Sequence, residues 1–166
     1  MKTTTQKIVM SSMLAALICV ATMIIKIPSP LKGYINLGDC VVLLSGWILS
    51  PLYGFLVAGI GSALADIFSG YLVYAPATFI IKGLMAFSAY HIFKLFSKKK
   101  TGMFPRAISG LSAELIMIVG YYLFEGFLYG FIPSAVNIPA NCIQGIFGLV
   151  LGVTLIKLFE KNKIMM

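Results

Sequence analysis

The chain has 166 residues, of which 60% are hydrophobic and only 11% are charged, whereas a soluble domain carries about 25% charged residues. Thirteen basic and five acidic residues are too few to cover the outside of such a chain in water, and the mean hydropathy of +0.98 instead predicts one domain solvated by lipid. The formal charge of +8 does not indicate nucleic-acid binding, because the basic residues lie between apolar runs rather than on a polar face with interleaved aromatic residues.

Six apolar segments are long enough, or nearly so, to cross the membrane as helices, which takes about 20 residues. They are predicted at residues 8–25, 35–50, 51–69, 75–96, 107–130 and 139–159. Lys26, Pro28 and Pro30 end the first span, and Pro51 opens the third span directly after the second, so these two spans form a tight helical hairpin. The expected fold is an all-α integral membrane protein, a compact bundle of six transmembrane helices forming a single domain over residues 1–166.

The distribution of lysine and arginine predicts the orientation of the bundle, because basic residues near the ends of spans are retained in the cytoplasm. With both termini cytoplasmic, ten of the thirteen basic residues lie inside and two lie outside. The inner set is Lys2, Lys7, Lys94, Lys98, Lys99, Lys100, Arg106, Lys157, Lys161 and Lys163, and the outer set is Lys26 and Lys32.

Five ionisable residues fall inside the predicted spans or at their edges, where each costs about 2.5–3.5 kcal/mol at the centre of a helix. The direction of each span places Asp39, Asp66, Lys82 and Glu125 toward the outer leaflet and only Glu114 in the inner half. One interpretation is an internal ion pair between Lys82 and either Asp66 or Glu125. The other is a binding site.

The outer end of the bundle also collects more hydrogen-bonding side chains than packing requires, and aromatic walls with a few convergent polar groups are typical of a small-molecule site. The alternative for any one tyrosine is an interfacial belt, because tyrosine prefers the headgroup level. Residues 26–34 are long enough to fold over such a pocket as a lid, or they are a plain connector. The candidate substrate-binding residues are Tyr34, Asn36, Asp39, Asp66, Tyr74, Lys82, Tyr121, Tyr122, Glu125, Asn137, Asn141 and Gln144.

Motifs of common catalytic chemistry are absent from the sequence. It contains no G-x-x-x-x-G-K-[ST] phosphate loop, no H-E-x-x-H and no G-x-S-x-G, and His91 is its single histidine. The cysteines lack the paired spacing of a disulfide frame or a zinc site. We therefore expect no catalytic residues, no metal and no cofactor, and the chain cannot hydrolyse ATP through a phosphate loop.

Four motifs carry a resemblance to a known family: YINLGD at residues 34–39, SPLYG at 50–54, GSALAD at 61–66 and YAPATFIIKG at 74–83. With them the chain resembles the substrate-binding S components of energy-coupling factor (ECF) transporters. The resemblance is to the branch once labelled riboflavin-type, which includes proteins assigned to pyridoxine and hydroxymethylpyrimidine. It covers nearly the whole chain in length, span number and topology.

The resemblance implies a multi-pass protein of a bacterial cell membrane that is not an enzyme. Such a subunit captures a vitamin or vitamin precursor from outside, here with vitamin B6 or hydroxymethylpyrimidine as the best match. It then docks onto a transmembrane coupling subunit that carries two cytoplasmic ATPases, and toppling in the bilayer opens its pocket inward.

The resemblance also implies a docking face on the first span, where the family commonly places an Ala-x-x-x-Ala pattern. The matching positions are Ser11 to Ala15 or Ser12 to Ala16, so serine replaces the first alanine. Small residues at this spacing let a partner helix approach closely.

Two other classes of function remain as alternatives. One is an integral-membrane enzyme acting on a lipid or an isoprenoid, with Asp39, Asp66 and Glu125 as metal ligands or acid/base groups. The other is a purely structural or assembly subunit.

Overall fold

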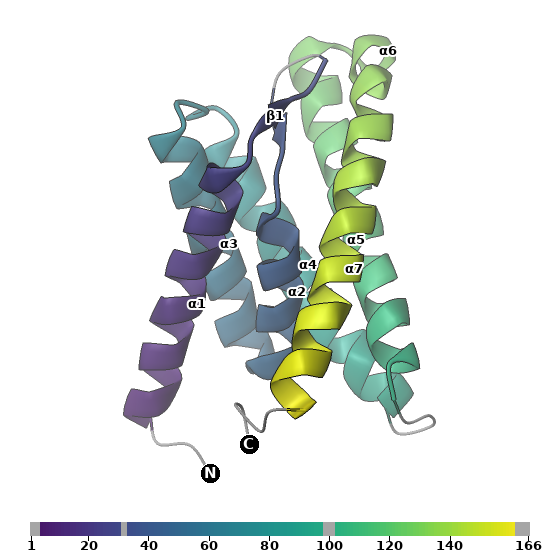
Figure 1. Cartoon of the computed structure of the whole chain (residues 1–166). Coiled ribbons are helices and arrows are strands. Elements are labelled where there is room, and N and C mark those ends of the chain that lie inside the picture. Colours follow the sequence, from purple (N-terminus) through teal and green to yellow (C-terminus); the bar gives the residue numbers. More distant parts are fainter. Residues whose placement is uncertain (1–3, 31–32, 98–101, 162–166) are drawn as a thin grey trace.

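Helices run through all six predicted apolar segments of the chain. The computed structural model describes residues 4–30, 33–97 and 102–161, and Figure 1 shows their helices side by side in one bundle. The predicted fold class is confirmed: five helical stretches are long and apolar enough to cross a membrane, and a sixth is shorter. The membrane helices are α1 (Thr4–Ile24), α2 (Gly38–Ile48), α3 (Pro51–Phe68), α4 (Ala75–Ser97), α5 (Phe104–Tyr129) and α7 (Ile138–Lys161).

The short helix α2 lies in the middle of the bundle. Its 11 residues reach only about 16 Å, well short of the roughly 30 Å hydrocarbon core. Ten of the 11 are buried, because α2 packs against α1, α3, α4 and α7. Protein therefore surrounds α2, and it does not need the length of a lipid-exposed span.

A β-hairpin precedes α2 and shortens it relative to the predicted span 35–50. Strands β1 (Ile27–Pro28) and β2 (Tyr34–Ile35) pair antiparallel, so the helix begins only at Gly38. The Asn36 side chain accepts a hydrogen bond from the Gly38 N–H at 2.9 Å and satisfies one of the free donors at the helix start. Figure 1 shows the hairpin at the end of the bundle opposite both termini.

A second short element closes the outer end between α5 and α7. Gly130, at φ +93°, ends α5 in a conformation that glycine adopts without strain. The turn continues as α6 (Phe131–Ser134) and the 3₁₀ helix η1 (Ala135–Asn137), neither of which the sequence predicted. It places the Asn137 side chain over the outer part of α5, within hydrogen-bond distance of Glu125.

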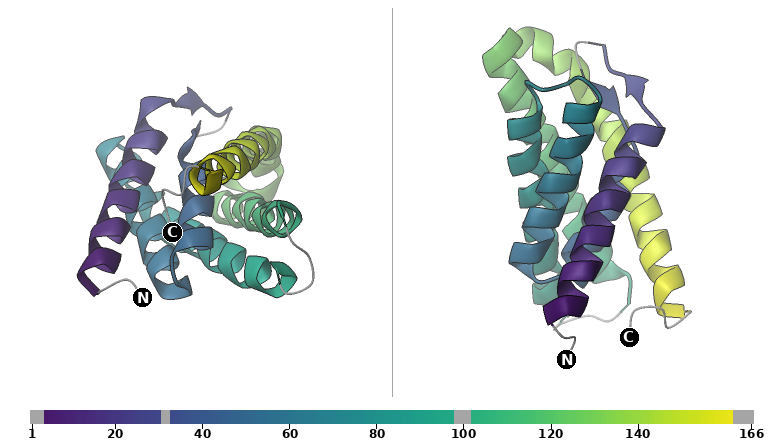
Figure 2. Two further views of the ribbon diagram at one scale, coloured as in Figure 1. Left: turned by 60° about the horizontal axis from the view of Figure 1, so that its bottom comes forward. Right: turned by 90° about the vertical axis from the view of Figure 1, so that its left-hand side faces the viewer.

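The first turn of α1 and the last turn of α7 lie at the same end of the bundle, as the right-hand view of Figure 2 shows. At this end Arg106 on α5 bonds Glu160 on α7, with an Nη1 to Oε2 distance of 3.2 Å. The positive-inside rule assigns this end to the cytoplasm. Six of the basic residues behind that assignment lie outside the described residues, namely Lys2, Lys32, Lys98, Lys99, Lys100 and Lys163.

Candidate functional site

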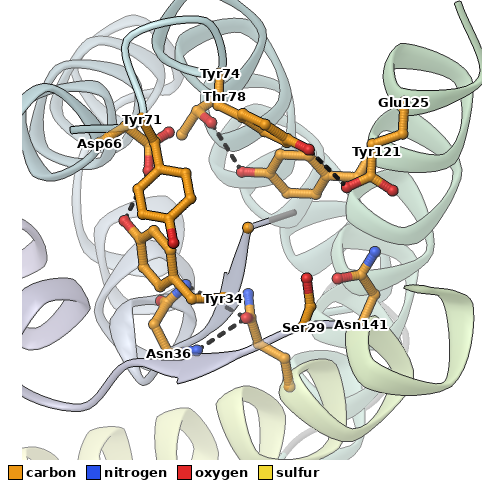
Figure 3. A pocket seen from close by; sticks show the side chains of 12 residues that line it. Ser29, Tyr34, Asn36, Asp66, Tyr71, Tyr74, Thr78, Tyr121, Glu125 and Asn141 are labelled. Atoms are coloured by element: carbon orange, nitrogen blue, oxygen red, sulfur yellow. Dashed lines mark hydrogen bonds between the residues drawn. The ribbon is translucent and has the colours of Figure 1, made fainter. Parts of the chain in front are cut away.

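A small pocket lies at the outer end of the bundle, between the hairpin and four helices. Figure 3 shows its side chains converging from the hairpin, from the outer parts of α3 and α4, and from α5 and α7. Its cavity volume is about 40 Å³. The lining residues are Ser29, Gly33, Tyr34, Asn36, Asp66, Tyr71, Tyr74, Thr78, Tyr121, Glu125, Asn141 and Gln144.

One wall of the pocket joins the hairpin to the end of α3. The Tyr34 hydroxyl donates a hydrogen bond of 2.7 Å to Oδ1 of Asp66, and the Tyr34 ring lies 5.0 Å, centroid to centroid, from the ring of Tyr71. Burial, together with the Asp66 carboxylate beside it, raises the pKa of the Tyr34 hydroxyl above its ordinary value. Tyr34 therefore keeps its proton and remains a donor at neutral pH. Lys26 at the base of the hairpin adds a 3.0 Å hydrogen bond to Ser69.

The opposite wall is built around the buried carboxylate of Glu125. Asn137 donates from its amide nitrogen to both Glu125 oxygens, at 2.9 and 3.0 Å, and the Tyr74 hydroxyl donates to Oε1 at 3.3 Å. Glu125 lines the pocket, whereas Asn137 is absent from the lining. Asn137 thus holds the carboxylate in place from behind.

A third group of side chains comes from α4 and α5. The hydroxyls of Thr78 and Tyr121 are 3.0 Å apart, so each orients the other at the pocket surface. The Tyr121 ring also lies near the ammonium group of Lys82, with Nζ 5.6 Å from the ring centroid. This distance falls within the range of a cation–π contact. Tyr121 is therefore in contact with both the pocket and the buried charge beside it.

The floor of the pocket is a chain of hydrogen bonds that leads to a buried ion pair. Gln144 accepts from the backbone N–H of Asn36 at 2.9 Å and donates to Oδ2 of Asp39 at 2.7 Å. The other oxygen of Asp39 accepts from the ammonium group of Lys82 in an ion pair. Both charged side chains are almost completely buried. Each charge compensates the other, and either one would be costly in free energy if it were buried alone.

This ion pair corrects one interpretation of the sequence. Lys82 pairs with Asp39 of α2, and the predicted pairing with Asp66 or Glu125 is wrong. The sequence gives the depth of each residue along its helix but not the direction of its side chain, and at this depth Lys82 faces the central helix. Asp39 and Lys82 therefore lie beneath the pocket rather than on its surface.

Eight of the 12 candidate substrate-binding residues line the pocket, and Asp39, Lys82, Asn137 and Tyr122 do not. Neighbouring residues of a helix point about 100° apart, so with Tyr121 turned inward Tyr122 turns away from the pocket. The Tyr122 ring packs against Phe131, with centroids 5.8 Å apart.

Four lining residues were not among the candidate substrate-binding residues: Ser29, Gly33, Tyr71 and Thr78. Tyr71 was expected at the outer end of the bundle but was not assigned to the site. Thr78 follows Tyr74 by four residues, a spacing that places both side chains on one face of a helix, and this signal could have found it. Ser29 and Gly33 belong to the segment that was predicted to form a lid or a connector. Their backbones meet, because Ser29 N–H donates to the Gly33 carbonyl at 3.2 Å.

A separate apolar groove runs between α1 and α3, with a cavity volume of about 590 Å³. All four predicted docking residues line it: Ser11, Ser12, Ala15 and Ala16. Ser12 and Ala16 are exposed, Ala15 is half-buried and Ser11 is buried. The two helices lie close together here, since a Cβ atom on Gly61 of α3 would come within 2.6 Å of the Ala15 carbonyl oxygen.

Comparison with known proteins gives consistent matches over almost the whole chain. Residues 2–161 match the family described as ECF-type riboflavin transporter, S component. An uncharacterized protein from Pyrococcus woesei, described by its place in the gap 3' region, is 32% identical over 136 residues, which are 81% of this chain and 88% of that protein.

Two solved structures share the fold. The S component of a bacterial ECF transporter matches with a TM-score of 0.78 at 25% identity, over 96% of this chain and 98% of that one. The S component for biotin from an ECF-type ABC transporter matches with a TM-score of 0.60 at 22% identity, over 95% of each chain. At 22% identity the second likeness concerns the fold alone.

Proposed function

The chain belongs to the family of ECF-type riboflavin transporter S components, and we propose that it captures a vitamin or vitamin precursor from the outer side of the membrane. Members of this family are transport subunits and not enzymes. Membership in this family therefore excludes the two alternative functions, a membrane enzyme acting on lipid and a purely structural subunit. The best candidates for the substrate are vitamin B6 and hydroxymethylpyrimidine.

The composition of the outer pocket is the observation that carries this proposal. Tyr34, Tyr74 and Tyr121 offer flat apolar surfaces, and their hydroxyls are already engaged by neighbouring groups. Asp66 and Glu125 contribute acceptors, and Asn141 and Gln144 contribute amides. Such a surface fits one aromatic ring with hydroxyl or amino substituents, and both proposed substrates have that form.

Within this proposal the remaining candidates act behind the ligand. Asn137 fixes Glu125, while Asp39 and Lys82 fix Gln144 from below. Tyr122 packs at the outer turn against Phe131. We expect these four residues to affect substrate affinity through the groups that they position.

The size of the cavity indicates that the ligand must displace part of the lining. A volume of about 40 Å³ is far below the roughly 300–1,000 Å³ of typical ligand sites. The hairpin is held together by a short ladder, because it pairs through only two residues in each strand. We infer that the hairpin side of the pocket, at Ser29 and Tyr34, moves outward when substrate enters.

Energy for release on the inner side must come from another protein, because the sequence has no phosphate loop. We propose that the α1–α3 groove docks the transmembrane ECF coupling subunit, which works with two ATPase subunits. Ser12 and Ala16 would meet that partner directly, since both are exposed in the groove. The groove and the pocket share no lining residue, so binding and docking can be tested separately.

The test is binding and transport by the purified protein. Pyridoxine and hydroxymethylpyrimidine are titrated calorimetrically into the protein in detergent, and any co-purified compound is identified by mass spectrometry. In vesicles the protein alone should bind substrate without accumulating it, and accumulation should require the coupling subunit, both ATPases and ATP. Uphill uptake by the isolated protein would overturn the assignment, and failure of both compounds to bind would overturn only the choice of substrate.

A further inference from the structure

Glu114 is a buried acid that does not line the substrate pocket. It lies near the middle of α5, where it faces Gly145 and Gly148 of α7, and it is only 5% exposed. Neither of its carboxyl oxygens has a hydrogen-bond partner among the described residues. A polar group in this position costs free energy, so its presence in the bundle calls for a physical explanation.

Two glycines of α7 make the space that this acid occupies. A Cβ atom on Gly145 would come within 3.2 Å of Oε2 of Glu114, and one on Gly148 within 3.1 Å of Oε1. The same Cβ on Gly148 would come within 2.7 Å of the Cβ of Asp39. Glu114 and Asp39 therefore lie on either side of one glycine, close to the ion pair beneath the pocket.

The charges around Glu114 decide which form of the acid fits. Asp39 of α2 lies across Gly148 from Glu114 and is paired with Lys82 of α4, and Cys142 of α7 lines the same groove as Glu114. The single positive charge of Lys82 is already paired with Asp39. An ionised Glu114 would leave a net negative charge inside the bilayer, which is costly, whereas the protonated acid leaves the group neutral.

An apolar groove connects Glu114 with the lipid phase. It lies between α5 and α7, has a cavity volume of about 270 Å³ and includes Glu114 in its lining. Leu111 and Leu115 of α5 and Ile146 and Val150 of α7 form its exposed sides. Glu114 is not part of the lining of the substrate pocket, so a reagent dissolved in the membrane can approach it by a separate route.

We propose that Glu114 is a proton-binding site inside the membrane, open to lipid through the α5–α7 groove, and that it is a reserve partner for Lys82. While Asp39 is ionised and holds Lys82, Glu114 keeps its proton. When the proton of Glu114 passes to Asp39, Asp39 becomes neutral, Glu114 is ionised and pairs with Lys82, and the three groups together keep the same charge. This inference concerns the protein without ligand and does not depend on the proposed substrate.

Dicyclohexylcarbodiimide is a suitable probe, because it dissolves in lipid and reacts with protonated acids. The carboxyl oxygen bonds to the central carbon of the carbodiimide, and the acid proton moves to one of its nitrogens. The acyl group then shifts from oxygen to the other nitrogen and gives a stable N-acylurea. Nothing leaves, so the adduct has the mass of protein plus reagent.

The experiment uses the full chain in phospholipid vesicles, with peptide mass spectrometry to locate the adduct. We expect labelling of wild type at Glu114, declining as the pH is raised, and loss of that adduct in Glu114→Gln. A water-soluble carbodiimide should not label this residue. Ile146→Trp, which fills the mouth of the groove, should remove most of the adduct, whereas Phe147→Trp on the neighbouring exposed position outside the groove should leave it unchanged.

The role as reserve partner is tested with a matched pair of variants. Asp39→Asn removes the partner of Lys82 and should abolish labelling of Glu114, whereas Asp66→Asn leaves the ion pair intact and should keep it. Absence of a Glu114 adduct in folded wild type at every pH would overturn the proton site, and equal labelling from water would overturn the lipid route. Persistent labelling in folded Asp39→Asn would overturn the reserve role. If that variant does not fold, Asp39→Ser, which also removes the carboxylate, takes its place with the same two outcomes. Lys82→Met serves as the control, because without the cation Glu114 should stay protonated and labelled.

Discussion

The side-chain amide of Gln144 donates a 2.7 Å hydrogen bond to Asp39, a residue 105 positions away in the chain. The oxygen of the same amide accepts from the backbone of Asn36. Gln144 thus connects the surface that faces a ligand with the ion pair in the centre of the bundle. A substitution at the ion pair should therefore alter the pocket surface, and a substitution at the pocket surface should alter the ion pair.

Breaking the central ion pair should be costly. Lys82→Met leaves the buried Asp39 without its cation, and we expect the free energy of unfolding to fall by about 3–5 kcal/mol. The control is Lys94→Met at an exposed position of the same helix, for which a change within about 0.5 kcal/mol is expected. Thermal unfolding in detergent measures both, and equal melting temperatures for the two variants would contradict the prediction. Asp39→Leu combined with Lys82→Met should recover much of the loss, because no unpaired charge remains.

Two residues of the pocket should contribute directly to substrate affinity. Asn141→Ala and Glu125→Gln each change a lining group that we propose to bind polar atoms of the ligand, and each should cost about 1–3 kcal/mol, roughly five- to a hundredfold in affinity. Glu114→Gln should bind like wild type at neutral pH, because glutamine resembles the protonated acid. Calorimetric titration of the three purified variants compares them. The outer pocket would be the wrong site if Glu114→Gln abolished binding while the other two behaved as wild type.

Sequence patterns were sufficient for the membrane helices but not for the elements between them. Long apolar runs bounded by proline, glycine and charge identify the helices, since lipid allows few alternatives to a helix. Strands of two residues, such as Ile27–Pro28, are too short to show any periodicity. Residues 131–137 were correctly placed between two predicted spans, but their sequence FIPSAVN carries no pattern that predicts the short helices α6 and η1.

The sequence allowed a prediction of how deep the site residues lie in the membrane, but not of the direction in which each side chain points. Tyr34, Asp66, Glu125 and Asn141 could be placed at one end of the bundle because direction along each span fixes depth. The partner of Lys82 could not, because it depends on how α2 and α4 are rotated against one another. That rotation is set by close packing, as where a Cβ on Gly46 would lie 2.5 Å from the Ala86 carbonyl oxygen.

Bulk added to the α1–α3 groove should separate docking from binding. Ala16→Trp places a large side chain at an exposed position in the groove, where helices that approach closely tolerate little extra volume. Uptake by the complete transporter should be lost while substrate affinity of the isolated chain stays near wild type. Met13→Trp, on the same helix but outside the groove lining, serves as the control and should transport normally. Loss of binding in Ala16→Trp would place α1 in the pocket instead.

The bond between Tyr34 and Asp66 should hold the hairpin against α3. Because the pKa of Tyr34 is raised, the folded protein favours the protonated phenol, so its contribution is complete below the ordinary tyrosine pKa of about 10 and is lost only as the pH rises beyond it. Tyr34→Phe should therefore speed amide hydrogen exchange in the hairpin by the same factor across neutral pH. Tyr71→Phe keeps the ring contact and should leave exchange unchanged. A Tyr34 effect that varied between mildly acidic and mildly basic solution would contradict this assignment.

The enclosure of α2 has a consequence for how the protein enters the membrane during synthesis. A segment of 11 residues is too short to be held in lipid by itself, and its charged Asp39 adds to the cost. α2 must therefore enter together with α3, to which it is joined with almost no intervening chain. The partners of Asp39, which are Lys82 on α4 and Gln144 on α7, are synthesised after it. α2 is therefore fully surrounded by protein only when α7 has been made and packed beside it.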